Sequence, residues 1–126
     1  MEQKYLIDSN PVIDFFNGKL TAGGKNFIAA IDPVVSVITH IELLNNKNIP
    51  WDEWVQLLDF IQIATICQLD NAIVEQTIIL RQQHKIKTPD AIIAATALIH
   101  GFTLISRNLF DFKNIPELNV IDPYTL

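Results

Sequence analysis

Residues 87–101 read KTPDAIIAATALIHG, a stretch that is almost entirely apolar after its first four positions. Its opening is typical of a helix start, because Thr88 suits the N-cap and Pro89 suits the first helical position. We therefore predict a buried helix that begins here. Asp90 would gain from the positive end of the helix dipole in the first turn. Capping could explain this acid completely, so its role depends on the rest of the sequence.

The composition predicts one domain, residues 1–126, in a soluble cytoplasmic protein. With 126 residues and 49% hydrophobic content, the chain can bury roughly two-thirds of its unfolded surface. Cys67 is the single cysteine, which excludes an intramolecular disulfide and a multi-cysteine metal site. No apolar segment reaches about 18 residues, and the sequence does not open with a basic run followed by a long apolar stretch.

The distribution of charge matters more than its sum. The formal net charge of −5 argues against a phosphate-rich partner, since nucleic-acid affinity depends mainly on Lys and Arg. From residue 76 to 113, however, five basic side chains accompany two acids. The basic ones are Arg81, Lys85, Lys87, Arg107 and Lys113. This stretch is either a local basic rim or a set of solvated helix faces.

Hydrophobic patterning predicts strands and helices that alternate along the chain. Short apolar or β-branched runs predict strands at residues 5–7, 34–38, 103–105 and 119–121, with a further candidate at 61–66. Helices are expected at residues 10–16, 39–44, 51–61, 71–84 and 88–100, with a helical turn at 108–112. Gly18 and the pair Gly23 and Gly24 are expected to break the first helix. This order predicts an α/β fold with a mainly parallel sheet.

Four acids fall at comparable junctions of these elements. Asp8 ends the first strand, Glu42 follows the second, Asp90 starts a helix and Asp111 lies just beyond the strand that ends at Ile105. Binding sites in open α/β sheets form beyond the carboxyl ends of the strands, so we expect these acids to converge. Crowded carboxylates repel one another unless a cation neutralises them, and oxygen ligands suit Mg²⁺ or Mn²⁺. The pattern therefore predicts a metal site that can hold a phosphodiester and polarise water.

Each acid also has a simpler interpretation. Thr39 and Glu42 fit a capping box, in which the acid would reach back to the N–H of the threonine. Asp8 could satisfy donors of the following loop, and Asp111 could be a surface residue. Taken together these interpretations are weaker, because capping does not require four acids at junctions of one kind.

Three segments resemble the PIN-domain ribonucleases, and within them the VapC-type toxins of toxin–antitoxin modules. YLIDSNPVIDFF resembles the family's opening strand with its first acid, Asp8. VSVITHIELL is similar to the second motif and places the second acid on Glu42. TPDAIIAATALIHGFTLISRNLFDF resembles the third and fourth motifs, with Asp90 as third acid and a last polar cluster of Ser106, Asn108 and Asp111.

The resemblance implies a PIN-like three-layer sandwich, with helices on both faces of a mainly parallel central sheet. It also implies an endoribonuclease that uses Mg²⁺ or Mn²⁺ to activate a water for attack on RNA. The implied catalytic and metal residues are Asp8, Glu42, Asp90 and Asp111, with Asn108 as a further metal ligand. Many PIN domains carry an acid where Asn108 stands, so either Asn108 or Asp111 completes the site. Substrate contacts are expected from Asn10, Ser106 and Arg107.

The same resemblance implies a cognate protein antitoxin and a homodimer. Trp51, Trp54 and Leu58 share one helical face, which predicts core packing, with an exposed groove for a partner as the alternative.

Two other functions remain open from the sequence. A degenerate PIN-like domain that only binds RNA or protein would keep the fold and lose carboxylates. An Asp-dependent phosphatase normally needs a second acid two residues after the first, where this chain has Asn10.

Overall fold

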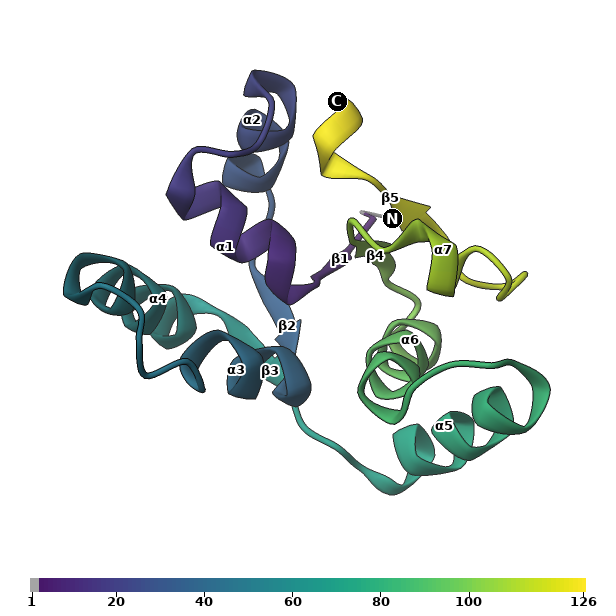
Figure 1. The fold of residues 1–126 in the computed structure, drawn as a ribbon. Coiled ribbons are helices and arrows are strands. Elements are labelled where there is room, and N and C mark those ends of the chain that lie inside the picture. The colour runs from purple at the N-terminus through teal and green to yellow at the C-terminus, as the bar shows by residue number, and fades with distance from the viewer. Residues whose placement is uncertain (1–2) are drawn as a thin grey trace.

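The computed structural model describes residues 3–126 and contains short parallel strands between two layers of helices (Figure 1). Strands β1 (Tyr5–Ile7), β4 (Thr103–Ile105) and β5 (Val120–Ile121) form one sheet in the order β1-β4-β5. Strands β2 (Val34–Ser36) and β3 (Thr65–Cys67) pair with each other, and β2 lies against β1. Every pairing is parallel, so the carboxyl ends of the strands point to one edge.

Alternation along the strands creates two hydrophobic cores, one on each face. Leu6 and Leu104 belong to the first core and their neighbours Ile7 and Ile105 to the second. Since successive strand residues point to opposite faces, such uninterrupted apolar runs require helices on both sides. The predicted three-layer arrangement is confirmed.

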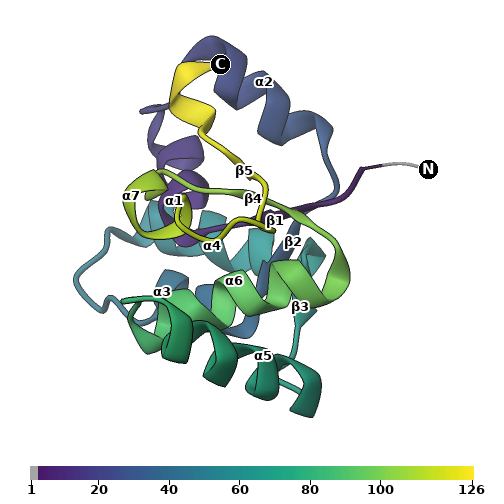
Figure 2. The same ribbon diagram turned by 90° about the vertical axis from the view of Figure 1, so that its right-hand side faces the viewer.

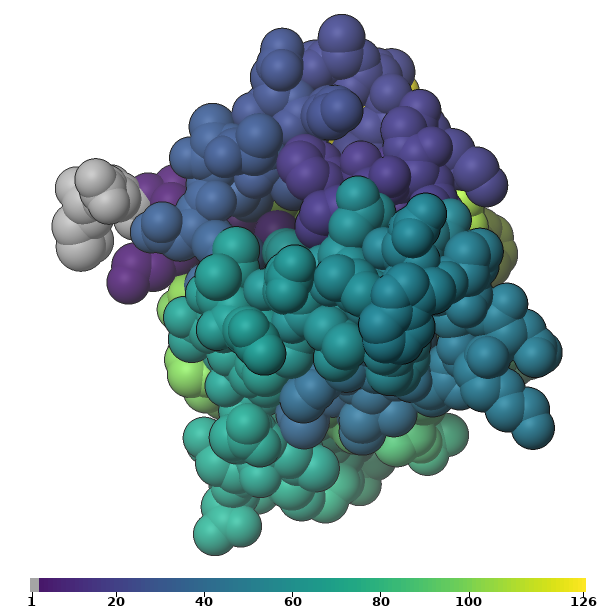
Figure 3. All heavy atoms as spheres, turned by 90° about the vertical axis from the view of Figure 1, so that its left-hand side faces the viewer, coloured from purple at the N-terminus to yellow at the C-terminus, as the bar shows by residue number. Residues whose placement is uncertain are grey.

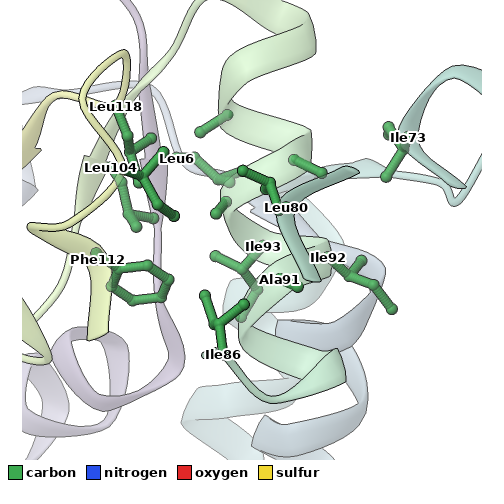
Figure 4. Packing of buried hydrophobic residues seen from close by; sticks show 14 of the residues in the cluster. Leu6, Ile73, Leu80, Ile86, Ala91, Ile92, Ile93, Leu104, Phe112 and Leu118 are labelled. Carbon is green, nitrogen blue, oxygen red and sulfur yellow. The ribbon is translucent and has the colours of Figure 1, made fainter. Parts of the chain in front are cut away.

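The first core lies under α5 (Asn71–Gln83), α6 (Thr88–His100) and α7 (Leu109–Phe112). In Figure 2, α6 lies across the strands and α5 packs along its outer side. Every residue from 91 to 97 is buried, because α6 is covered by the sheet on one side and α5 on the other. Figure 4 shows Leu6, Leu104, Ile93 and Phe112 meeting in this core.

The second core lies under α1 (Ser9–Asn17), α2 (Ala22–Ala30), α3 (Val37–Leu44) and α4 (Trp51–Ile63). A 3₁₀ turn, η1 (Pro123–Thr125), follows β5 and packs on α2. Among the described residues, no helix combines the length and apolar character needed to cross a membrane.

The prediction that Gly23 and Gly24 would break the helical structure is wrong. Both lie inside α2, a helix that the sequence analysis missed. A Cβ on Gly24 would collide with the carbonyl oxygen of Pro123, and one on Gly23 would collide with the backbone of Leu126. Glycine lowers the helix propensity at these two positions. It is nevertheless required there, because it lets the C-terminal residues approach α2 closely. Gly18 does end α1, with φ of 70°.

Two predicted helix starts are displaced. The second strand ends at Ser36, whose hydroxyl caps α3 by accepting from the N–H of Ile38, so α3 begins two residues before Thr39. The capping box of Thr39 and Glu42 is therefore wrong. Lys87, not Thr88, occupies the N-cap position of α6 and makes no side-chain capping bond there.

The prediction that Trp51 packs in the core is also wrong. Its side chain is 73% exposed, whereas Leu57 is the buried residue of α4. Helix α4 has only one buried position, so its hydrophobic spacing did not identify which side faces the core.

Candidate active site

Asp8 is fixed at the end of β1 by the neighbouring strand β4. Its N–H donates to the carbonyl of Ile105 (2.9 Å), which extends the β1 and β4 pairing by one residue. The carboxylate caps α1 and accepts from the N–H of Ser9 (2.8 Å), while its other oxygen accepts from the hydroxyl of Ser106 (2.8 Å). Asp8 is only 7% exposed. Both oxygens are thus held by neutral donors, which orient the carboxylate without neutralising its charge.

Glu42 reaches the same place from α3. The hydroxyl of Ser9 donates to Oε1 of Glu42 (3.1 Å), which links the second acid to the residue after Asp8. The pKa of Glu42 lies above its usual value because its carboxylate is partly desolvated. The Ser9 hydrogen bond opposes this shift, and the charge of Asp8 adds to it.

The pKa of Asp90 is affected by the charges of all three other acids. Its pKa is raised to about 6, first by desolvation and then by the negative charges of Asp8, Asp111 and Glu42. Lys87 opposes the shift but does not cancel it. The charges of the three other acids therefore all act on one half-buried side chain.

The fourth acid is held by the predicted polar cluster. Asn108 caps α7, and its side-chain amide donates to Oδ2 of Asp111 (2.7 Å) while its carbonyl oxygen accepts from the N–H of Asp111 (3.3 Å). The N–H of Asn108 in turn donates to the hydroxyl of Ser106 (3.0 Å), which bonds Asp8. Ser106 and Asn108 therefore connect the first acid to the last.

Arg107 faces a neighbour that the sequence analysis missed. Its Nη1 lies 3.7 Å from Oδ2 of Asp14, and its guanidinium lies 5.7 Å from the ring centre of Tyr124. The Tyr124 hydroxyl donates to Asp14. The pKa of Tyr124 is raised, first by burial and then by this hydrogen bond and the charge of Asp14. The side chain of Arg107 is still 58% exposed, so it also borders solvent beside Ser106.

Asn10 lies on the first turn of α1, and its side chain is exposed. No hydrogen bond of this amide is present within residues 3–126. The structure places it beside Ser9, and its amide makes no hydrogen bond to the acids of the described residues.

The side-chain oxygens of these residues are suitable ligands for a hard divalent cation. All four acids offer carboxylate oxygens, the ligands preferred by Mg²⁺ and Mn²⁺, and Asn108 offers an amide oxygen. In the arrangement described for residues 3–126, no three acids, histidines or cysteines lie close enough together to form a complete metal site. The raised pKa of Asp90 supports the fit, because after desolvation its causes are the negative charges of the other three acids, which a cation would relieve.

Comparisons with known proteins show the family to which this chain belongs. A family model described as the PIN domain matches residues 5–118. Ribonuclease VapC1 of Rickettsia felis is 29% identical over an alignment of 131 residues, and the alignment covers 92% of this chain and 93% of that protein.

Solved structures of other proteins are also similar to this chain. A chain in a toxin–antitoxin complex from Klebsiella pneumoniae is 35% identical, with a TM-score of 0.79 and coverage of 96% of this chain and 98% of that one. A chain of FitAcB from Neisseria gonorrhoeae has a TM-score of 0.82 at 19% identity, with coverage of 97% and 99%, and this likeness concerns the fold alone.

Proposed function

This chain belongs to the PIN domain family, in its VapC-type branch, and from that premise we propose that it is a metal-dependent endoribonuclease, the toxin of a toxin–antitoxin pair. One observation carries the proposal. Three acids from three different elements all raise the pKa of Asp90, at the edge where parallel strands end. Capping alone does not require four acids whose charges act on one side chain.

Asp8, Glu42, Asp90 and Asp111 would hold Mg²⁺ or Mn²⁺, with Asn108 able to add its amide oxygen. Such an ion, when bound, supplies an activated water and neutralises charge on a phosphodiester. The contribution of the chain is orientation. Ser9 and Ser106 fix the two oxygens of Asp8, and each oxygen keeps a lone pair free. Asn108 fixes Asp111 in the same manner.

The RNA substrate would approach over basic side chains that border the acids. Lys87 lies close enough to Asp90 to affect its pKa, and Arg107 is exposed beside Ser106. These cations would attract the RNA backbone although the protein as a whole carries a net charge of −5. An acidic centre with a basic border reconciles a metal site with a polyanionic substrate.

We place the antitoxin on the surface formed by α1, α2 and α4. A largely apolar cavity of about 310 Å³ lies between α1, α2 and α4, on the face shown in Figure 3. Phe15, Phe16, Ile28, Phe60 and Ile63 contribute to its wall. An amphipathic helix of a partner could bury apolar side chains there. The Ile63→Glu variant should weaken antitoxin binding and leave RNA cleavage intact.

A second copy of the chain would pack against α5. Val74 and Ile78 are exposed one helical turn apart, so they form an apolar stripe that is not covered within the described chain. Light scattering on wild type and on Ile78→Glu tests this placement, with a dimer expected for the first and a monomer for the second.

The function is tested with purified protein offered single-stranded RNA, single-stranded DNA and a phosphate monoester, each with Mg²⁺ or with a chelator. We expect cleavage of RNA in Mg²⁺ alone. Hydrolysis of the monoester would instead favour a phosphatase. Binding of RNA without cleavage by folded, metal-loaded protein would favour a binding module.

A further inference from the structure

Helix α7 presents two phenylalanines in opposite directions. Phe112 is completely buried in the first core, where Figure 4 shows its ring beside Leu104 and Ile86. Residues two apart on a helix point about 200° away from each other, so the anchoring of Phe112 directs Phe110 outward. The side chain of Phe110 is 76% exposed, which is a costly position for an aromatic ring without a partner.

The exposed ring is carried by the residue next to one of the four acids. Phe110 directly precedes Asp111, whose charge acts on Asp90. The two hydrogen bonds between Asn108 and Asp111 fix the turn that carries the ring. The position of Phe110 relative to the acids is therefore set by the same contacts that position the fourth carboxylate.

A basic side chain lies over the ring. Nζ of Lys113 lies 5.5 Å from the centre of the Phe110 ring, and Arg107 is exposed at the other end of the same segment. A surface for a protein partner would favour a broader apolar patch, as around the cavity between α1, α2 and α4. An exposed aromatic ring with a lysine over its face is instead a combination that binds single-stranded nucleic acid, by stacking of a base and neutralisation of phosphate.

We propose that Phe110 is a stacking platform for one nucleobase of the RNA substrate, next to the bond that is cut, and that Lys113 contacts the adjoining phosphate. This inference rests on the proposed ribonuclease function. Phe110 acts as a binding and specificity residue, because it fixes which nucleotide lies beside the acids. It does not take part in the chemical step.

The substitution series separates stacking from simple apolar contact. Relative to wild type, Phe110→Ala should raise KM for a single-stranded RNA by about 5- to 150-fold, the range expected for loss of one stacked base, with a much smaller change in kcat. Phe110→Trp should retain the wild-type KM, whereas Phe110→Leu should resemble the alanine variant. Trp51→Ala removes an equally exposed aromatic residue from α4 and should leave KM unchanged.

A second measurement locates the stacked base. Once the cleaved bond is mapped, RNAs that lack a single nucleobase near it are compared with the intact RNA. One missing base should raise KM for wild type and have little further effect on Phe110→Ala, because the ring and the base belong to one interaction. In the same way, Lys113→Gln should reduce the salt dependence of KM.

The outcomes distinguish this inference from the function beneath it. If wild type cleaves no RNA in Mg²⁺, the proposed function fails and Phe110 loses its role with it. If wild type cleaves and Phe110→Ala has the same KM and base preference, the stacking platform alone is refuted. A Phe110→Ala protein that cleaves normally but binds its antitoxin less tightly would assign the ring to a protein contact.

Discussion

Asp8 and Asp14 are two acids of the same short segment, equally buried at 7% exposure, with opposite surroundings. Asp14 faces the guanidinium of Arg107 and the hydroxyl of Tyr124. Asp8 accepts from two neutral donors and lies near Glu42 and Asp90. Burial alone therefore does not mark a functional acid.

Asp8 and Asp14 differ in the sign of the charges near them. Asp14 connects α1, the segment after β4 and η1, and its cation is supplied by the chain itself. The group around Asp8 contains four carboxylates, and among the described residues only Lys87 offsets the resulting shift at Asp90. We infer that Asp14 serves the fold and that the Asp8 group serves an added cation.

The largest effect is expected from removal of one charge in the Asp8 group. Asp90→Asn should lower kcat/KM for RNA more than about 100-fold, since even outer residues of a metal site cost 10- to 100-fold. Circular dichroism should show an intact fold, because the amide is nearly isosteric and α6 does not depend on a side-chain cap. Wild-type activity in this folded variant would remove the metal-site interpretation.

The next effect concerns the fourth ligand. Asp111→Asn should raise the Mg²⁺ concentration for half-maximal cleavage by about 10- to 100-fold, because a carboxylate neutralises a cation and an amide does not. Asn108→Ala should mainly slow turnover at saturating Mg²⁺, since Asn108 orients Asp111. A magnesium titration of both variants measures the difference. An unchanged metal requirement in Asp111→Asn would assign completion of the site to Asn108.

Changes around Asp14 should affect stability instead of catalysis. Tyr124→Phe leaves one acceptor of a buried carboxylate without its donor and should lower the free energy of unfolding by about 1 to 2 kcal/mol. The corresponding fall in Tm is about 3 to 6 °C per kcal/mol for a domain of this size. Thermal melts and cleavage at 20 °C should separate the two properties. A large loss of kcat at that temperature, in folded protein, would place Asp14 within the site.

The smallest effect is a pH dependence of stability in chelator. Asp90 has a pKa of about 6 in the folded chain against 3.8 as the reference value, so between these values the folded state binds more protons than the unfolded state. The free energy of unfolding should therefore fall as pH rises from about 4 to 6, by roughly 1 kcal/mol after allowance for solvent screening. Urea titrations of wild type and Asp90→Asn should differ by this slope. If the free energy of unfolding changes with pH in the same way in both proteins, the pKa of Asp90 is not raised in the folded chain.

Strands and long helices could be predicted because their signals are local. β1 and β4 were predicted at their observed residues, since each is a short apolar run that ends at a polar residue. Helix α2 could not be predicted in this way. Its two glycines are explained only by residues 123–126, which lie about 100 residues further along the chain.

The four acids could be predicted from the sequence, whereas the hydrogen bonds that hold acids in place could not. Asp8 follows β1, Asp90 and Asp111 lie in the first turns of their helices, and Glu42 lies on the helix that follows β2; topology brings such positions together. Two of these hydrogen bonds join residues far apart in the sequence. Ser9 and Glu42 are 33 positions apart, and Tyr124 and Asp14 are 110 positions apart. Neither spacing leaves a periodic signal in the sequence.

The most direct test is a magnesium titration of RNA cleavage with wild type, Asp8→Asn and Asp14→Asn side by side. The two variants remove one charge each from acids of equal burial on one segment. We expect metal-dependent cleavage by wild type, the same magnesium requirement in Asp14→Asn measured below its lowered Tm, and no cleavage by Asp8→Asn at any concentration. Equal activity of Asp8→Asn and wild type, or cleavage by wild type in chelator, would contradict the account.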